Sequence, residues 1–155
     1  MPSLKEGDSA PPITLATDSG ESFTLSSLKG KNVVLYFYPK ADTPGCTKES
    51  CEFRDTFKKF TKANTVIVGI SPDASTKQAK FKEKFDLPFV LLADIDHKAC
   101  EDYDVWKEKS MYGKKYLGVE RSTFLIDGKG VLRQAWRKVK VDGHAESVLA
   151  AVKAL

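Results

Sequence analysis

Two cysteines stand five positions apart in PKADTPGCTKESCEF, residues 39–53, and the first follows a Thr-Pro-Gly sequence. Thr43 before Pro44 is typical of a helix N-cap followed by proline at the first helical position. This places Cys46 in the first helical turn, near free backbone N–H groups and the positive end of the helix dipole. Because that environment favours a thiolate, Cys46 is a candidate nucleophile.

Cys51 belongs to the same expected helix, which we place at about residues 43–62. At about 100° per residue, Cys46 lies beside an apolar stripe of phenylalanines, whereas Cys51 lies about 140° away. We therefore expect Cys46 to face the core and Cys51 to face water. Helical residues five apart have α-carbons about 8 to 9 Å apart, beyond the about 7 Å that a disulfide can span. A disulfide between them would require the helix start to unwind, and Gly45 makes that turn easy to open.

The chemistry open to such a thiolate depends on its partners. A Cys-His hydrolase needs an imidazole that moves protons, and neither His97 nor His144 has a recognisable catalytic context. Peroxide reduction needs only a thiolate and hydrogen-bond donors for the departing oxygen. A protein thiol-disulfide oxidoreductase stays an alternative, although its Cys-x-x-Cys pair is missing. A binding or chaperone module with inert thiols is the third.

Composition excludes several other classes of protein. Three cysteines do not suit a disulfide-stapled secreted fold, and with two separated histidines they do not suit zinc, so we expect no metal and no cofactor. The 25 basic and 21 acidic residues are interleaved, which argues against nucleic acid as a partner. The longest apolar run, residues 33–38, is far too short to span a membrane, and the opening residues lack an apolar signal core. We expect a soluble cytoplasmic protein with no membrane partner.

The elements that must position Cys46 alternate along the chain, and residues 1–155 have the length of one domain. The expected strands lie at 13–16, 22–25, 33–38, 65–71, 89–94, 121–126 and 131–137, and the further helices at 75–85, 96–106 and 144–155. Helical crossovers give parallel pairs, whereas the DSGE and DGKG turns give hairpins. We therefore predict an α/β fold with a mixed central sheet flanked by helices and an N-terminal β-hairpin. Residues 107–119 are expected to form a surface loop.

Pro39, Thr43 and Cys46 form the pattern P-x-x-x-T-x-x-C. This pattern resembles the active-site signature of the peroxiredoxins. A second cysteine five positions on is similar to the bacterioferritin comigratory protein branch, also called peroxiredoxin Q. The similarity continues through YFYPK, GIS, WKEKSMYGKKYLGVERSTFLID and the closing helix, and so extends over essentially the whole chain.

The resemblance implies a thioredoxin-like fold and an antioxidant thiol peroxidase of the atypical 2-Cys kind. Cys46 would be the peroxidatic cysteine, oxidised to sulfenic acid by hydrogen peroxide or an organic hydroperoxide. Cys51 would be the resolving cysteine, forming an intramolecular disulfide that thioredoxin reduces. Thr43 and Arg121 would orient the substrate, and Pro39 would shield the pocket. The resemblance also implies a monomer.

Three side chains have simpler interpretations as well. Cys100 lies on an apolar stripe, and we expect it to serve packing rather than chemistry. Thr43 can act as a helix cap that accepts the Cys46 N–H while donating to substrate. On spacing alone, Arg121 would be a surface ion-pair residue.

Overall fold

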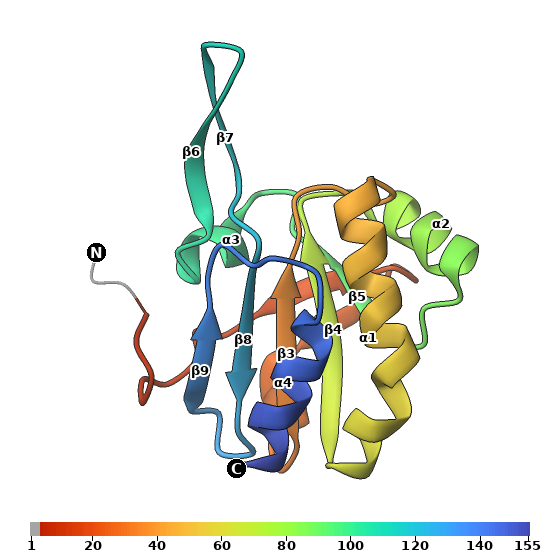
Figure 1. Ribbon diagram of the computed structural model, residues 1–155, viewed down its shortest axis with the longest axis vertical. Helices are drawn as coiled ribbons and strands as arrows, with labels where there is room; N and C mark the ends of the chain where they lie inside the picture. Colours follow the sequence, from red (N-terminus) through yellow and green to blue (C-terminus); the bar gives the residue numbers. More distant parts are fainter. Residues whose placement is uncertain (1–3) are drawn as a thin grey trace.

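The computed structural model describes residues 4–155 and arranges them around a seven-stranded sheet (Figure 1). The strand order is β2-β1-β5-β4-β3-β8-β9. The strands are β1 (Thr14–Thr17), β2 (Ser22–Thr24), β3 (Asn32–Phe37), β4 (Thr65–Ser71), β5 (Val90–Ala93), β8 (Ser122–Ile126) and β9 (Leu132–Trp136). β3, β4 and β5 are parallel, and the other neighbours pair antiparallel. The mixed sheet and the N-terminal hairpin of β1 and β2 are thus confirmed.

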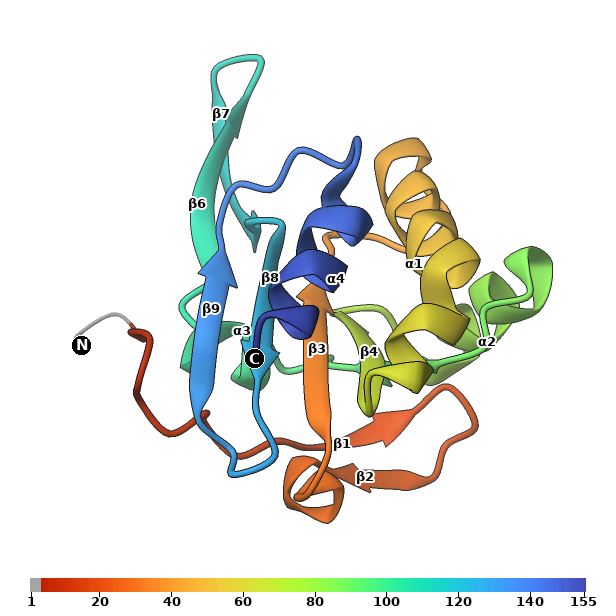
Figure 2. The same ribbon diagram turned by 60° about the horizontal axis from the view of Figure 1, so that its bottom comes forward.

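The sheet is covered on both faces, as the doubly apolar sequence of β3 predicts. Val34 and Tyr36 point into one core, which α1 (Pro44–Lys62), α2 (Ser75–Phe85) and α4 (His144–Lys153) cover. Figures 1 and 2 show these three helices on the same side of the sheet. Leu35 and Phe37 point into a second core, which contains α3 (Lys98–Asp102) and the short 3-10 helix η1 (Leu25–Leu28). Residues 38–43 join the carboxyl end of β3 to the start of α1.

Gly69 of β4 stands beside Tyr36 in the parallel register. A Cβ atom at this position would come within 2.9 Å of the Tyr36 ring and 2.8 Å of Leu91. Glycine is thus required for the tyrosine to lie flat against β4, beneath α1.

The expectation of a surface loop at 107–119 is wrong. Residues Trp106–Met111 form β6 and Lys114–Val119 form β7, a separate two-stranded sheet that projects from the body of the molecule (Figure 1). Tyr112 and Gly113 both have positive φ, as a two-residue hairpin turn requires. Both faces of the hairpin are largely exposed, so its sequence lacks the apolar alternation that identifies a strand.

The helix expected at 96–106 is also shorter than predicted. It occupies only Lys98–Asp102, because His97 takes a left-handed conformation at its start and Trp106 opens β6. Within residues 4–155, no helix combines the length and apolarity needed to cross a membrane.

Candidate active site

The start of α1 carries Cys46 where the sequence predicts it. Thr43 is the N-cap, Pro44 is the first helical residue and Cys46 is the third. The Cys46 side chain is fully buried and belongs to the core between α1 and the sheet. The expectation that it faces the core is confirmed. Its sulfur lies in a helical turn whose N–H groups have no partners further back in the helix.

Thr43 does not make the capping bond that we expected. Its hydroxyl donates to the carbonyl oxygen of Lys40 at 2.8 Å, and it accepts no hydrogen bond from the first turn. The hydroxyl is thus turned back toward the loop that precedes the helix. Because the hydroxyl hydrogen is already donated to Lys40, the Thr43 oxygen can bond a further partner only as an acceptor.

Arg121 reaches Cys46 from 75 residues away in the sequence. It lies between β7 and β8, and its Nη2 donates to Cys46 Sγ at 3.2 Å, while its Nη1 donates to Glu49 Oε1 at 2.6 Å. The guanidinium thus places a positive charge and a hydrogen-bond donor beside the sulfur. Gly45 permits this approach, because a Cβ atom there would lie 3.2 Å from Nη2.

Glu49 is a member of the site that the sequence reasoning missed. Its side chain is 1% exposed, and its Oε2 has no hydrogen-bond partner among the described residues. Burial raises the pKa of Glu49 to about 7, against the opposing effect of Arg121. Its position three residues after Cys46 places both on neighbouring parts of the helix surface. A glutamate in the charged run TKESCE nevertheless suggests an exposed residue.

Lys109 of β6 is a second missed neighbour. Burial lowers its pKa, the charge of Arg121 lowers it further, and a charge on Cys46 would raise it. Lys109 therefore lies within electrostatic range of the Cys46 and Arg121 pair. It was overlooked because the hairpin that carries it was not expected.

Cys51 does not face open water as predicted, since its side chain is only partly exposed. Burial raises its pKa, and the charge of Arg54 opposes that rise. Arg54 donates to the carbonyl oxygen of Phe85 at 2.8 Å, so this flank of α1 lies against the end of α2. Both Cys46 and Cys51 are free thiols within an intact helix.

The loop from β3 to α1 contains Pro39, which is partly buried. The loop is held by Asp73, which lies between β4 and α2, and by Gln78 of α2. The Ala41 N–H donates to Asp73 Oδ2 at 2.7 Å, and the Tyr38 hydroxyl donates to Gln78. Gln78 in turn donates to Ser71 Oγ at 2.8 Å. These bonds fix the path that the chain follows into Thr43.

The remaining cysteine and both histidines make their contacts with residues other than Cys46. Cys100 is buried in the core on the opposite face of the sheet, and burial raises its pKa. His144 is bonded through Nε2 to the Thr123 hydroxyl at 2.7 Å, and burial lowers its pKa to about 4. His97 stacks on Trp106 with ring centroids 3.8 Å apart. The contacts of these residues support packing roles.

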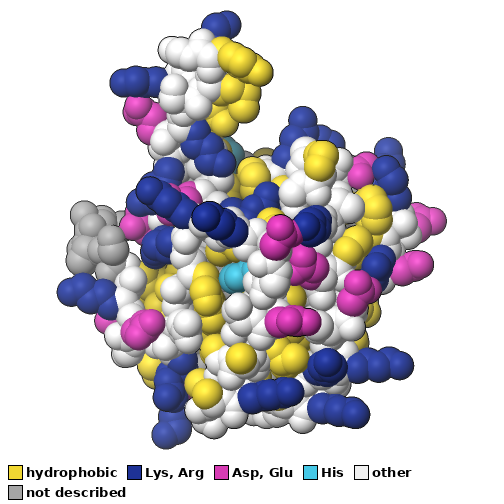
Figure 3. Space-filling view, viewed as in Figure 1, with side chains coloured by type: hydrophobic (Ala, Val, Ile, Leu, Met, Phe, Trp, Pro, Cys, Tyr) yellow, Lys and Arg dark blue, Asp and Glu magenta, His cyan; other side chains and the backbone are white. Residues whose placement is uncertain are grey.

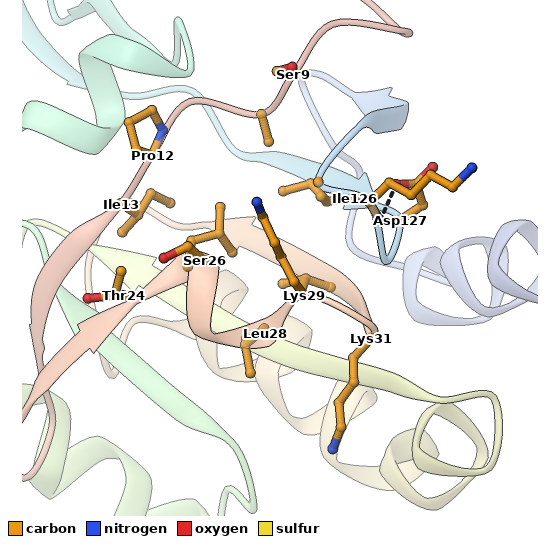
Figure 4. Close-up of a pocket in the computed structure, with 15 residues that line it drawn as sticks. Ser9, Pro12, Ile13, Thr24, Ser26, Leu28, Lys29, Lys31, Ile126 and Asp127 are labelled. Atoms are coloured by element: carbon orange, nitrogen blue, oxygen red, sulfur yellow. Dashed lines mark hydrogen bonds between the residues drawn. The ribbon is translucent and has the colours of Figure 1, made fainter.

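A hollow of about 220 Å³ lies elsewhere, between the N-terminal segment, η1 and the turn that joins β8 to β9 (Figure 4). Ile13, Leu25 and Ile126 contribute apolar walls, and Lys29 and Lys129 also line it. None of the five site residues predicted from the sequence is among those that line it.

Comparison with known proteins settles the family. Residues 7–135 match the AhpC/TSA family. A putative peroxiredoxin Bcp of Coxiella burnetii is 54% identical over 95% of this chain and 97% of its own length. Peroxiredoxin Bcp of Bacillus subtilis is 53% identical, over 97% of this chain and 96% of its own. The chain belongs to the peroxiredoxins.

Solved structures agree with this peroxiredoxin in fold. Xanthomonas campestris peroxiredoxin Q has a TM-score of 0.90 at 45% identity, covering 97% of this chain and 96% of its own. A cysteine variant of Xylella fastidiosa PrxQ has a TM-score of 0.93 at 39% identity, covering 99% and 98%. The thioredoxin-like fold, the peroxiredoxin Q branch and thiol peroxidase activity are thereby confirmed. This peroxiredoxin reduces a peroxide at the expense of a thiol reductant.

Proposed function

We propose that this peroxiredoxin reduces hydrogen peroxide and organic hydroperoxides at Cys46, with Cys51 as the resolving cysteine and thioredoxin as the reductant. The observation that carries this assignment is the Arg121 guanidinium, which bonds both Cys46 Sγ and the buried Glu49. The Xanthomonas campestris bacterioferritin comigratory protein, at 44% identity, has alkyl peroxide reduction activity. That activity supports organic hydroperoxides as substrates here.

In the first step, the Cys46 thiolate attacks the terminal oxygen of the peroxide. A sulfur–oxygen bond forms, the oxygen–oxygen bond breaks, and the sulfur loses two electrons to become sulfenic acid. The departing oxygen takes a proton and leaves as water or an alcohol. Arg121 and the N–H groups of the first turn stabilise the charge that develops on it. Thr43 accepts the peroxide O–H, and Pro39 shields the reacting atoms from water.

In the second step, the Cys51 thiolate attacks the sulfenic sulfur of Cys46. A disulfide forms, the sulfur–oxygen bond breaks, and the oxygen leaves as water after taking a proton. Because the two cysteines are too far apart in the helix, α1 must first unwind from residue 46 to residue 51. Unwinding also brings the partly buried Cys51 into water, which relieves the burial that raises its pKa.

The cycle proposed here is complete within one chain, which supports a monomer of one domain. The thiols of a thioredoxin-dependent cycle must be returned to the reduced state, and the bacterial cytoplasm is the compartment that maintains reduced thiols. We therefore propose a cytoplasmic location.

Cysteine variants test the assignment. Cys46→Ser is expected to consume no peroxide. Cys51→Ser is expected to react with one equivalent and then stall with thioredoxin, because no disulfide can form within the chain. Cys100→Ser serves as the control and should retain full turnover. Sustained thioredoxin-dependent turnover in Cys51→Ser would contradict the resolving role and indicate a one-cysteine mechanism.

A further inference from the structure

Exposed apolar side chains gather on the β6–β7 hairpin. Among the described residues, six large hydrophobic side chains are exposed, and four of them belong to this short hairpin. They are Met111, Tyr112, Tyr116 and Leu117, which are 56%, 98%, 43% and 59% exposed. Figure 3 shows the apolar surface at the tip of the hairpin, on the side toward α1. Solvent-exposed apolar patches on a projecting element are typical of interaction sites.

The hairpin is continuous with the candidate active site. β7 ends at Val119, two residues before Arg121. Lys109 pairs with Tyr116 across the hairpin, and Met111 lies two positions further along on the same face. The charges of Arg121 and Cys46 both act on Lys109, so this residue lies within electrostatic range of the cysteine. The hairpin and the start of α1 stand at the same end of the molecule (Figure 1).

The charge of the hairpin indicates what kind of molecule it binds. Residues 106–119 contain four lysines and one glutamate. Lys107 pairs with Asp104 and Lys115 with Glu108. In residues 4–155, the ion pairs include no partner for Lys109 or Lys114. Two hairpins from two copies of the chain would bring these lysines together, and their positive charges would repel each other. An acidic partner would not repel the lysines.

We infer that the β6–β7 hairpin is the docking arm for the acidic dithiol protein that reduces the Cys46–Cys51 disulfide. The partner presents an apolar surface around its reactive cysteine and acidic side chains at the rim of that surface. This inference rests on the proposed function. The reductant is the macromolecule that must approach the start of α1, and the arm stands beside that approach.

Reduction is a two-electron exchange. A thiolate of the partner attacks one sulfur of the Cys46–Cys51 disulfide, which forms a mixed disulfide and releases the other sulfur as a thiolate. The second thiol of the partner, after losing its proton, attacks the mixed disulfide. The peroxiredoxin regains both thiols, and the partner carries the disulfide away. The arm acts by holding the partner in place during both attacks.

The test uses the double variant Met111→Ser with Tyr116→Ser, two exposed side chains on the face of the hairpin that carries Lys109, compared with Leu155→Ser. Leu155 is 45% exposed at the opposite end of the molecule and controls for the loss of an exposed apolar side chain (Figure 1). Turnover is measured with a bacterial thioredoxin kept reduced by NADPH and thioredoxin reductase, and separately with dithiothreitol. We expect the hairpin variant to raise the KM for thioredoxin by about tenfold. Turnover with dithiothreitol and oxidation by one equivalent of peroxide should match the wild type.

Charge gives an independent variant. Lys114→Glu should raise the KM for thioredoxin and weaken its dependence on salt, again with unchanged turnover in dithiothreitol. A wild-type KM in both variants would overturn the docking arm. If KM is unchanged while the double variant loses affinity for anionic lipid vesicles or loses self-association, the arm serves a membrane or a second copy instead. Failure of the proposed function gives a different pattern, since the wild type itself would then form no disulfide with peroxide.

Discussion

At the scale of single residues, the surroundings of Cys46 are formed by residues that precede it and by residues that follow it in the sequence. The chain before it supplies the helix start, and Arg121 arrives from the junction of β7 and β8. Glu49 holds one side of the guanidinium, so that the other side faces the sulfur. The buried carboxylate therefore acts on the sulfur through Arg121 and is a positioning residue.

Gly45→Ala tests this arrangement without removing any polar group. The added methyl would lie 3.2 Å from Arg121 Nη2, so the guanidinium must shift by a few tenths of an ångström from the position in which it bonds Cys46. We expect the rate of Cys46 thiol loss with one equivalent of hydrogen peroxide to fall by about tenfold. Lys48→Ala, an exposed change in the same helical region, is the control. An unchanged rate in Gly45→Ala would show that the placement of Arg121 does not limit the reaction.

The sequence allowed Cys46 to be placed correctly because a Thr-Pro helix start is a local signal. Thr43 and Arg121 could be nominated only through the family pattern, because neither cap nor ion-pair spacing identifies a substrate contact. Glu49 was not predicted as a site residue, because its burial depends on the guanidinium of Arg121, which comes from a distant segment. Cys51 was placed on the correct helix, but its partial burial was not predicted. That burial depends on the end of α2, and the projection of a single helix contains no information about a neighbouring helix.

At the scale of elements, the first turns of α1 are held down by two side chains that lie between the cysteines. Glu49 bonds Arg121, and the fully buried Ser50 shares a 2.8 Å hydrogen bond with the Tyr36 hydroxyl of β3. Both bonds must break before Cys51 can reach Cys46. The packing of α1 on β3 therefore opposes disulfide formation.

Ser50→Ala removes one of these restraints. It leaves the Tyr36 hydroxyl buried without its partner, which costs the folded helix start about 1 to 3 kcal/mol. We expect faster disulfide formation after oxidation and less sulfinic acid at excess peroxide, measured by mass spectrometry of the alkylated protein. Thr56→Ala removes a comparable hydroxyl beyond Cys51, where it bonds only within the helix, and should change neither quantity. More sulfinic acid in Ser50→Ala than in wild type would contradict this role of the bond.

The elements themselves were largely predictable, apart from the β6–β7 hairpin and the length of α3. Strands buried on both faces and helices between them leave strong local patterns, as β3, β4 and α2 illustrate. The hairpin of β6 and β7 leaves no strong pattern along its strands, because both of its faces are largely exposed. The Tyr112-Gly113 turn was its single local signal, and it is weaker than the Asn-Gly or Asp-Gly pairs that identify such turns.

At the scale of the whole molecule, the C-terminal helix is tied to the sheet and to α1 near the site. His144, the first residue of α4, bonds Thr123 of β8 and packs edge-on against Phe53 of α1 and Trp136 of β9. Burial lowers the pKa of His144 to about 4, and the charge of Arg121 contributes. The histidine is therefore neutral in the folded protein near neutral pH.

The free energy of unfolding should consequently depend on pH through His144. As pH falls from about 6.5 to about 4, the unfolded chain binds a proton that the folded protein does not, so stability is lost by at most about 3 kcal/mol. Glu49 acts in the opposite sense. Its folded pKa is about 7, so its contribution is present below about 4.5 and is lost as pH rises to about 7. The two effects oppose each other in the wild type.

Comparison with His144→Gln separates them. Urea unfolding at pH 7 and pH 4.5 should show that the excess free energy of unfolding of the wild type over the variant shrinks at the lower pH. Glu49 is present in both proteins, so its contribution cancels in this difference. An advantage that stays constant between the two pH values would contradict a buried neutral histidine.

The most direct test of the account is the identity of the disulfide that peroxide produces. Lys48 lies between the two cysteines, so trypsin releases them on separate peptides, residues 41–48 and 49–54. Reduced protein is treated with one equivalent of hydrogen peroxide, alkylated and digested. The account predicts that these two peptides are joined by a Cys46–Cys51 disulfide. Two alkylated thiols, or a link from Cys46 to Cys100, would contradict it.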